Sequence, residues 1–233
     1  MAKVLKDHWA NISKKNGIDG ELLEKWIEEE EDPIPFQQAF DCANLNFKLR
    51  KRNIRQAIKH SNNSCPGPDG IPFLAWRRCS NFAVDLLFDA AQVMFEDDGR
   101  ERLAEEWSDF NQSLLFFLPK KATGTTASGE GIYEPENVRP LNVTNAENRI
   151  LANAMRLVIE PVVGRHVIWT QRGFIKGRSM IANLVDIEEA MVVTICSSDE
   201  GGALLFDFAS AFPSVEQDFM LDLFAAKQWP KWL

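Results

Sequence analysis

The sequence predicts an α+β fold that is rich in helix and contains a small sheet. Apolar residues recur at helical spacing in several long segments, which end at prolines, glycines or an Asp-Gly turn. Short apolar runs near residues 113–118, 138–143 and 203–208 are instead typical of strands. With 233 residues, of which 45% are hydrophobic, the chain can bury a core in one large domain or two small ones.

The N-terminal part of the chain is predicted to be helical, with one rigid turn. Pro33 and Pro35 separate the first two helices, because proline breaks a helix. The turn is predicted at residues 65–72, where three of eight residues are proline and two are glycine. The helices expected around it cover residues 20–31, 36–60, 72–78 and 80–96. The sequence Asp97-Asp98-Gly99 is expected to close the last of them.

A hairpin is predicted in the middle of the chain. Residues 113–118 are expected to form a buried strand that ends in Pro119-Lys120-Lys121, and a second strand near residues 137–143 contains Arg139. Residues 122–135 between them are rich in Gly, Thr, Ser and Ala and are expected to be a mobile loop. Such a hairpin can fold a cationic flap over a triphosphate. The alternative is a surface hairpin with ordinary solubilising charges.

Three more helices are predicted from their first turns. A Ser or Thr followed three residues later by Glu or Gln is a capping box, which opens a helix. Thr144 and Glu147 form one such pair, and Ser214 and Gln217 form another. Ser179 is expected to cap a further helix between them. The helix that starts at Thr144 is expected to end near Gly164, and the one capped by Ser179 near Cys196. The helix that starts at Ser214 is expected to end near Ala226.

Asp207 is the most informative candidate residue. The run at residues 203–206 predicts a fully buried strand, and this strand delivers the Asp207 carboxylate to its end. A charge at the end of a buried strand costs several kcal/mol unless it has a partner, which is often a metal ion. Asp207 is therefore a candidate site residue, and the alternative is an ordinary turn or cap residue.

The charge is distributed unevenly around a formal net charge of −8. Residues 45–60 contain six Lys or Arg and no acid, whereas residues 186–222 contain nine acids and no Lys or Arg. Residues 113–185 contain nine Lys or Arg and five acids. A basic middle beside an acidic segment fits a site that holds both phosphates and cations. The alternative is a set of solvated helix faces with uneven charge.

Other classes of protein are disfavoured. The cysteines Cys42, Cys65, Cys79 and Cys196 lack the spacing of a zinc site or a disulfide framework, and we expect them to be reduced. No run of about eighteen apolar residues is present, so no membrane span is predicted. The first ten residues are charged and do not resemble a signal peptide. An intracellular location is expected, and nucleus and cytoplasm are not distinguished.

Five short motifs follow one another along the chain in a known order. They are Pro66-Gly67-Pro68-Asp69-Gly70-Ile71-Pro72, Leu118-Pro119-Lys120-Lys121, Asn137-Val138-Arg139-Pro140-Leu141, Gln171-x-Gly173-Phe174-x-x-Gly177-Arg178-Ser179, and Asp207 through Phe212. This series resembles the reverse transcriptase domain of non-LTR (LINE-type) retrotransposons. The resemblance implies the fingers and part of the palm of a right-hand polymerase. It divides the chain into an acidic helical extension (1–44), the fingers region (45–200) and the start of the palm (201–233).

The resemblance implies a catalytic and metal-binding role for Asp207. This residue matches the first carboxylate of polymerase motif A, which binds two Mg²⁺ ions about 3.5–4 Å apart. The backbone carbonyl of Phe208 would join the metal shell. Phe212 matches an aromatic residue that blocks a ribose 2′-OH, which favours deoxynucleotides. The implied partners are an RNA template, a DNA primer and deoxynucleoside triphosphates.

The remaining implied roles concern the nucleotide and the template. Lys120 (or Lys121) and Arg139 match residues of the fingers that contact the incoming triphosphate. A second group matches a family signature near the template and the nucleotide pocket. Its members are Gln171, Gly173, Phe174 and Arg178.

The sequence departs from the family pattern in two places. Pro213 follows Phe212 where many relatives carry Asp, and we expect only a local change at the helix start. The aromatic-x-Asp-Asp motif of the family is expected beyond the helix after Asp207, and the sequence ends at Leu233 before it. We therefore expect a truncated polymerase that is inactive alone. The alternatives are a non-catalytic nucleic-acid-binding module, and a poorly folding product in which the Asp207 strand is an exposed edge.

Overall fold

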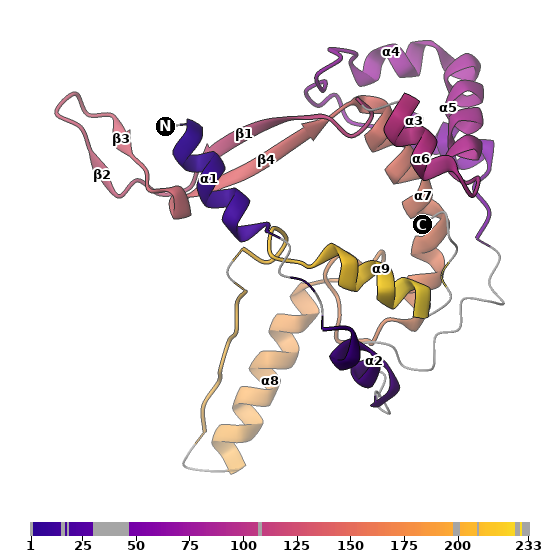
Figure 1. Ribbon diagram of the computed structural model, residues 1–233. Coiled ribbons are helices and arrows are strands. Elements are labelled where there is room, and N and C mark those ends of the chain that lie inside the picture. The colour runs from indigo at the N-terminus through magenta and orange to yellow at the C-terminus, as the bar shows by residue number, and fades with distance from the viewer. Residues whose placement is uncertain are drawn as a thin grey trace. The chain divides into compact units, whose positions relative to one another are not determined.

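The computed structural model describes residues 2–14, 17, 19–29, 47–106, 109–197, 201–208, 210–226 and 229 (Figure 1). Its elements are α1 (Ala2–Ile12), α2 (Gly20–Glu29), α3 (Lys51–Lys59), α4 (Phe73–Arg78), α5 (Ser80–Met94), α6 (Gly99–Glu106), β1 (Ser113–Pro119), β2 (Gly124–Thr125), β3 (Gly131–Ile132), the 3₁₀ turn η1 (Pro135–Asn137), β4 (Val138–Thr144), α7 (Ala146–His166), α8 (Ile181–Ser197) and α9 (Gln217–Ala226). The described chain is rich in helix and has two small antiparallel sheets, which confirms the α+β prediction.

The chain divides into two compact units. The first unit holds the described residues within 1–14 and 46–158, and the second holds those within 15–45 and 159–229. The boundary lies within α7, beside Pro161, a residue that cannot donate a helical hydrogen bond.

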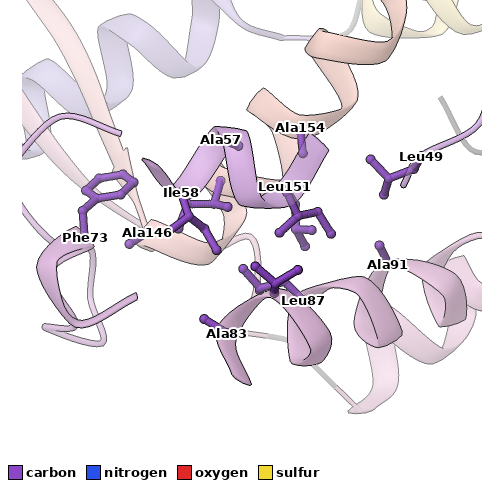
Figure 2. Close-up of a cluster of buried hydrophobic side chains, with 13 residues drawn as sticks. Leu49, Ala57, Ile58, Phe73, Ala83, Leu87, Ala91, Ala146, Leu151 and Ala154 are labelled. Atoms are coloured by element: carbon purple, nitrogen blue, oxygen red, sulfur yellow. The ribbon is translucent and has the colours of Figure 1, made fainter. Parts of the chain in front are cut away.

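The core of the first unit lies where α3, α5 and the first half of α7 pack together (Figure 2). On α5, Ala83, Leu87 and Ala91 are spaced four residues apart and share one buried face. Ile54 on α3 and Ile150 on α7 are almost completely buried against it. The buried alanines, which recur on all three helices, let the helix backbones approach closely.

The predicted helix at residues 36–60 is shorter than expected within the described residues. Residues 30–46 lie outside the described part, and α3 begins only at Lys51. Arg50 has an extended backbone (φ −130°, ψ 153°), and its N–H donates to Asn53 Oδ1 at 3.1 Å. Phe47 and Leu49 are buried while Lys48 between them is exposed, so this segment has the alternation of extended chain.

The helices predicted at 72–78 and 80–96 are confirmed as α4 and α5. The predicted turn at Asp97-Asp98-Gly99 does close α5, and it also opens α6, which the sequence patterns did not reveal. Gly99 is required at this close turn. A Cβ at this position would lie 2.5 Å from the carbonyl oxygen of Val93 and 2.6 Å from that of Met94.

The predicted hairpin is confirmed: β1 pairs with β4 in antiparallel register from Ser113↔Thr144 to Pro119↔Val138. Its strands are largely exposed, so the prediction of a buried strand at 113–118 was wrong. Among the described residues, β4 is the only strand that pairs with β1. Both strands of this sheet are therefore edge strands, and neither is flanked by strands on both sides. The predicted loop at 122–135 carries the small β2–β3 hairpin, visible at the end of the ribbon in Figure 1.

The helices of the C-terminal part are confirmed as α7, α8 and α9, but not all of their caps are. The Ile181 N–H donates to Ser179 Oγ at 3.3 Å, as expected for a helix start. Ser214 Oγ instead donates to the Ala211 carbonyl at 3.2 Å, and Gln217 is the first residue of α9 rather than its third. The predicted capping box of Thr144 and Glu147 is also contradicted: α7 begins at Ala146, directly after Asn145, and Thr144 is the last residue of β4.

The buried strand predicted at residues 203–206 is contradicted. Residues 201–208 have no regular secondary structure, and the side chains of Leu204 and Phe206 are 84% and 88% exposed. In the described part of the second unit, no strand lies beside this segment to share a hydrogen-bond ladder. The segment runs back along α8, and residues 201–205 line an apolar groove with that helix (Figure 1).

Candidate functional site

The turn at residues 65–72, the first of the five motifs, docks against the start of α7. The side-chain oxygen of buried Asn145 accepts a hydrogen bond from the Asp69 N–H at 3.2 Å. Asp69 Oδ1 in turn accepts from the Ile71 N–H at 3.0 Å, which closes the turn locally. Gly67 lies so close that a Cβ would be 2.4 Å from Asn145 Oδ1, and Gly70 has a φ of +70°. Both glycines are therefore required by the geometry.

Arg149 ties the segment before this turn to α7. Its guanidinium donates to Ser64 Oγ at 2.9 Å and to the Cys65 carbonyl at 2.6 Å. The same guanidinium lies 4.7 Å from the centre of the Phe73 ring, in a cation–π contact. Ser64, the Cys65 carbonyl and the Phe73 ring are all neutral, so these contacts hold Arg149 in place without pairing its charge.

Glu147 lies on the same helix turn and has an unusual environment. Burial of its carboxyl group raises the pKa of Glu147, and the nearby Asp69 carboxylate raises it further. Hydrogen bonds from its own backbone and from Asn145 act in the opposite direction. Within the described residues, its buried Oε2 has no hydrogen-bond partner. Neither Glu147 nor Asn145 was singled out from the sequence as a site residue.

The basic residues of the hairpin gather at one end of the β1–β4 ladder. The Lys120 N–H donates to the Asn137 carbonyl at 2.8 Å, and Arg139 lies opposite Leu118. Lys120 and Lys121 directly follow the last residue of β1, and Arg139 is the second residue of β4, so the three cations lie at the same end of the ladder. All three residues are exposed.

The loop after α7 is organised by Arg178. Its guanidinium donates four hydrogen bonds to backbone carbonyls, those of Gly164, Val167, Ile168 and Gln171, at distances from 2.5 to 3.1 Å. These carbonyls belong to the end of α7 and the turn that follows it, where helical partners are lacking. Arg178 therefore acts as a C-cap for α7, a role that spacing alone did not reveal.

The other predicted residues of this loop are arranged around that cap. Gln171 Nε2 donates to the Gly173 carbonyl at 3.1 Å. Phe174 is 96% exposed and has a φ of +61°, which is unusual for a non-glycine residue. Arg172, not picked out from the sequence as a site residue, fixes the loop to α8. It donates to Asn183 and pairs with Asp186 at 2.6 Å, and it stacks over Trp169 at 5.1 Å.

Asp207, Phe208 and Phe212 are exposed residues of the second unit, whereas the hairpin cations belong to the first. The structure brings Lys120 and Arg139 together, and it brings Gln171, Gly173 and Arg178 together. Among the described residues, the Asp207 side chain forms no hydrogen bond or ion pair with either set.

The described residues do not provide a magnesium site around Asp207. No group of three or more His, Cys, Asp or Glu side chains that could hold a metal ion occurs among them. The one adjacent Asp pair of the chain, Asp97-Asp98, lies in the turn between α5 and α6 of the other unit. Mg²⁺ prefers several carboxylate, phosphate or water oxygens, and one exposed carboxylate does not supply that set.

Comparison of the sequence with models of protein families finds no match, and comparison with curated proteins finds none either. The resemblance to non-LTR reverse transcriptases therefore rests on the five motifs alone. Of the helices in the described residues, none is long and apolar enough to cross a membrane.

Proposed function

We propose that this chain is part of an RNA-directed DNA polymerase of the non-LTR retrotransposon type, comprising its fingers and the start of its palm. The order of the five motifs supports the proposal. The feature that supports it most strongly is the β1–β4 hairpin, in which the exposed residues Lys120 and Arg139 lie at the same end of the ladder. In the proposed polymerase, these residues contact the phosphates of the incoming deoxynucleotide.

The chemistry of the two cations suits this task. The ammonium group of Lys120 is a compact point charge, whereas the guanidinium of Arg139 can bind two phosphate oxygens at once. Within the described residues neither side chain forms an ion pair, so both charges are available to a ligand. Phe212 would exclude the ribose 2′-OH, in keeping with a DNA product.

A nucleic-acid-binding module without chemistry is a second candidate. One observation favours it, namely that Asp207 is exposed and belongs to no metal-binding group of the described residues. The hairpin cations would serve this function equally well, because phosphate contacts provide most of the non-specific affinity for nucleic acid.

Binding of a fluorescently labelled RNA–DNA template–primer, measured by anisotropy over a range of salt concentrations, tests the part common to both candidates. Lys120→Ala combined with Arg139→Ala is expected to weaken binding at least tenfold. It should also lower the slope of log K against log[salt] by about one for each lost contact. The control is Lys14→Ala combined with Lys176→Ala, which removes two exposed charges that lie outside the hairpin. Equal binding by the two double variants, or no binding by the unchanged chain at low salt, would overturn the proposal.

Primer extension separates the two candidates. We expect the purified 233-residue chain to extend an RNA-templated primer no better than its Asp207→Ala variant, since Asp207 alone cannot hold two metal ions. Extension that depends on Asp207 would rule out the binding module and would show that this chain is active by itself.

A further inference from the structure

The first unit contains a polar pocket that lies outside the five motifs. It has a volume of about 390 Å³ and is formed by the end of α3, the segment at 61–64 and the middle of α7. Its apolar wall includes Ala57 and Phe73, which belong to the core cluster in Figure 2. The volume falls in the range of about 300–1,000 Å³ that is usual for small-molecule sites.

The pocket is lined by basic and neutral polar side chains. The polar side chains that matter for binding are His60, Asn62, Ser64, Arg149, Asn153 and Arg156. The described lining contains no Asp or Glu, although the chain as a whole has a net charge of −8. A concentration of positive charge on an acidic chain selects an anionic ligand.

The pocket is organised before any ligand binds. Arg149 is held by Ser64, Cys65 and the Phe73 ring, and its Nε is buried with no acceptor among the described residues. Arg156 Nε donates to Asn153 Oδ1 at 3.0 Å, which orients both side chains along α7. Arg77 fixes the opposite rim through the Ser61 carbonyl at 2.5 Å. Groups that are already ordered lose little entropy when a ligand binds.

The mixture of guanidinium groups, amides and one aromatic wall matches a nucleotide better than a bare anion. Arginine is well suited to phosphate oxygens because its fork of N–H donors fits them. The side-chain amides of Asn62 and Asn153 can both donate and accept, as the edge of a base requires. We propose that this pocket binds a phosphate group together with its attached nucleoside. The phosphate belongs either to a free nucleotide or to a nucleic-acid strand.

This inference stands on the first unit alone and does not require the polymerase proposal. Isothermal titration of the full chain with inorganic phosphate, adenosine and AMP tests it. AMP is expected to bind at least tenfold more tightly than adenosine and more tightly than inorganic phosphate. Arg156→Gln and His60→Gln are each expected to weaken AMP binding at least fivefold. Arg52→Gln, which removes an exposed arginine of α3 outside the pocket, serves as the matched control.

Comparison of one oligonucleotide with AMP distinguishes the sources of the phosphate. A tetraribonucleotide with a 5′-phosphate that binds more tightly than AMP would identify a strand, and equal binding would identify a free nucleotide. The proposal is overturned if AMP and adenosine bind equally or if AMP does not bind. It is also overturned if Arg52→Gln weakens binding as much as Arg156→Gln does. The hairpin variants described above should leave AMP binding unchanged, so the two proposals can fail separately.

Discussion

Single residues at the start of α7 decide how the Pro-Gly turn is held. Asn145 accepts the Asp69 N–H, and Arg149 holds the segment just before the turn. Glu147 lies between them on the helix, and its carboxyl group is partly buried near that of Asp69. Burial and the nearby Asp69 carboxylate therefore both disfavour the ionised form of Glu147.

The pKa of Glu147 is raised in the folded chain, so the folded state holds this proton more tightly than the unfolded state does. The resulting contribution to stability is fully present below the unfolded pKa of about 4.3 and is lost as the pH rises through the raised value. Glu147→Gln should therefore stabilise the chain at pH 7, by less than about 1 kcal/mol because the group is partly solvated. The gain should vanish near pH 4.

Denaturant unfolding of the two chains at pH 7 and pH 4 measures this difference. Glu105→Gln, on exposed α6, is the control and should change stability at neither pH. A Glu147→Gln variant that is less stable than the parent at pH 7 would contradict the prediction.

At the scale of elements, the loop after α7 depends on two arginine side chains. Arg178 satisfies four carbonyls at the end of the helix, and Arg172 holds the same loop to α8. The exposed β1–β4 hairpin is instead held together by the hydrogen bonds between its two strands. The loop is thus the more sensitive of the two to a single substitution.

Arg178→Ala should destabilise the second unit by about 1.5–3 kcal/mol, because hydrogen bonds from a charged donor to several carbonyls are lost together. Hydrogen exchange should speed up at residues 164–178, and thermal unfolding should begin earlier. Lys176→Ala, an exposed cation of the same loop, is the control and should change neither. Unchanged stability together with weaker template–primer binding would instead favour the template role that the resemblance implies for Arg178.

Elements with a strong local signal were predictable from the sequence. The apolar face of α5 and the strands of the β1–β4 hairpin follow directly from residue spacing. Residues 203–206 have the same apolar character, yet they form no strand, because a strand also needs a partner that local sequence cannot supply. Phe47 was expected on the apolar face of the helix predicted at 36–60, but it is buried in extended chain.

The candidate site was predictable only in part, for a related reason. Lys120 could be placed at the base of the hairpin and Arg139 on the facing strand because hairpin register is local. The contacts of Arg149 with Ser64 and Cys65 span more than eighty residues, and no spacing rule reports them. The pocket likewise depends on how α3 and α7 pack, which only the tertiary structure reveals.

At the scale of the whole molecule, the two units expose apolar surface to different degrees. In the second unit, α8 has no buried residue among those described, and the neighbouring segment at 204–208 is also exposed. Contiguous exposed apolar surface promotes association, whereas a single exposed side chain is ordinary. We therefore predict that the exposed apolar segment around Asp207 promotes association of the chain in solution.

Phe206→Asp should reduce concentration-dependent association at least threefold, as measured by light scattering. The thermal midpoint should change little, because the Phe206 side chain is 88% exposed. Phe174→Asp is the matched control, since that residue is equally exposed but stands in a loop away from this run. Association that both variants reduce equally, or that neither reduces, would contradict the prediction.

The Arg178 cap also bears on which substitutions the chain tolerates. Every residue type has a carbonyl, so this cap does not depend on the side chains at Val167, Ile168 or Gln171. A library of single substitutions should find those three positions permissive with respect to the cap. Position 178 should tolerate almost no residue other than arginine, because only arginine offers five donors in a rigid fork. As far as the cap is concerned, these three positions could then vary in sequence while Arg178 keeps the backbone path of the loop.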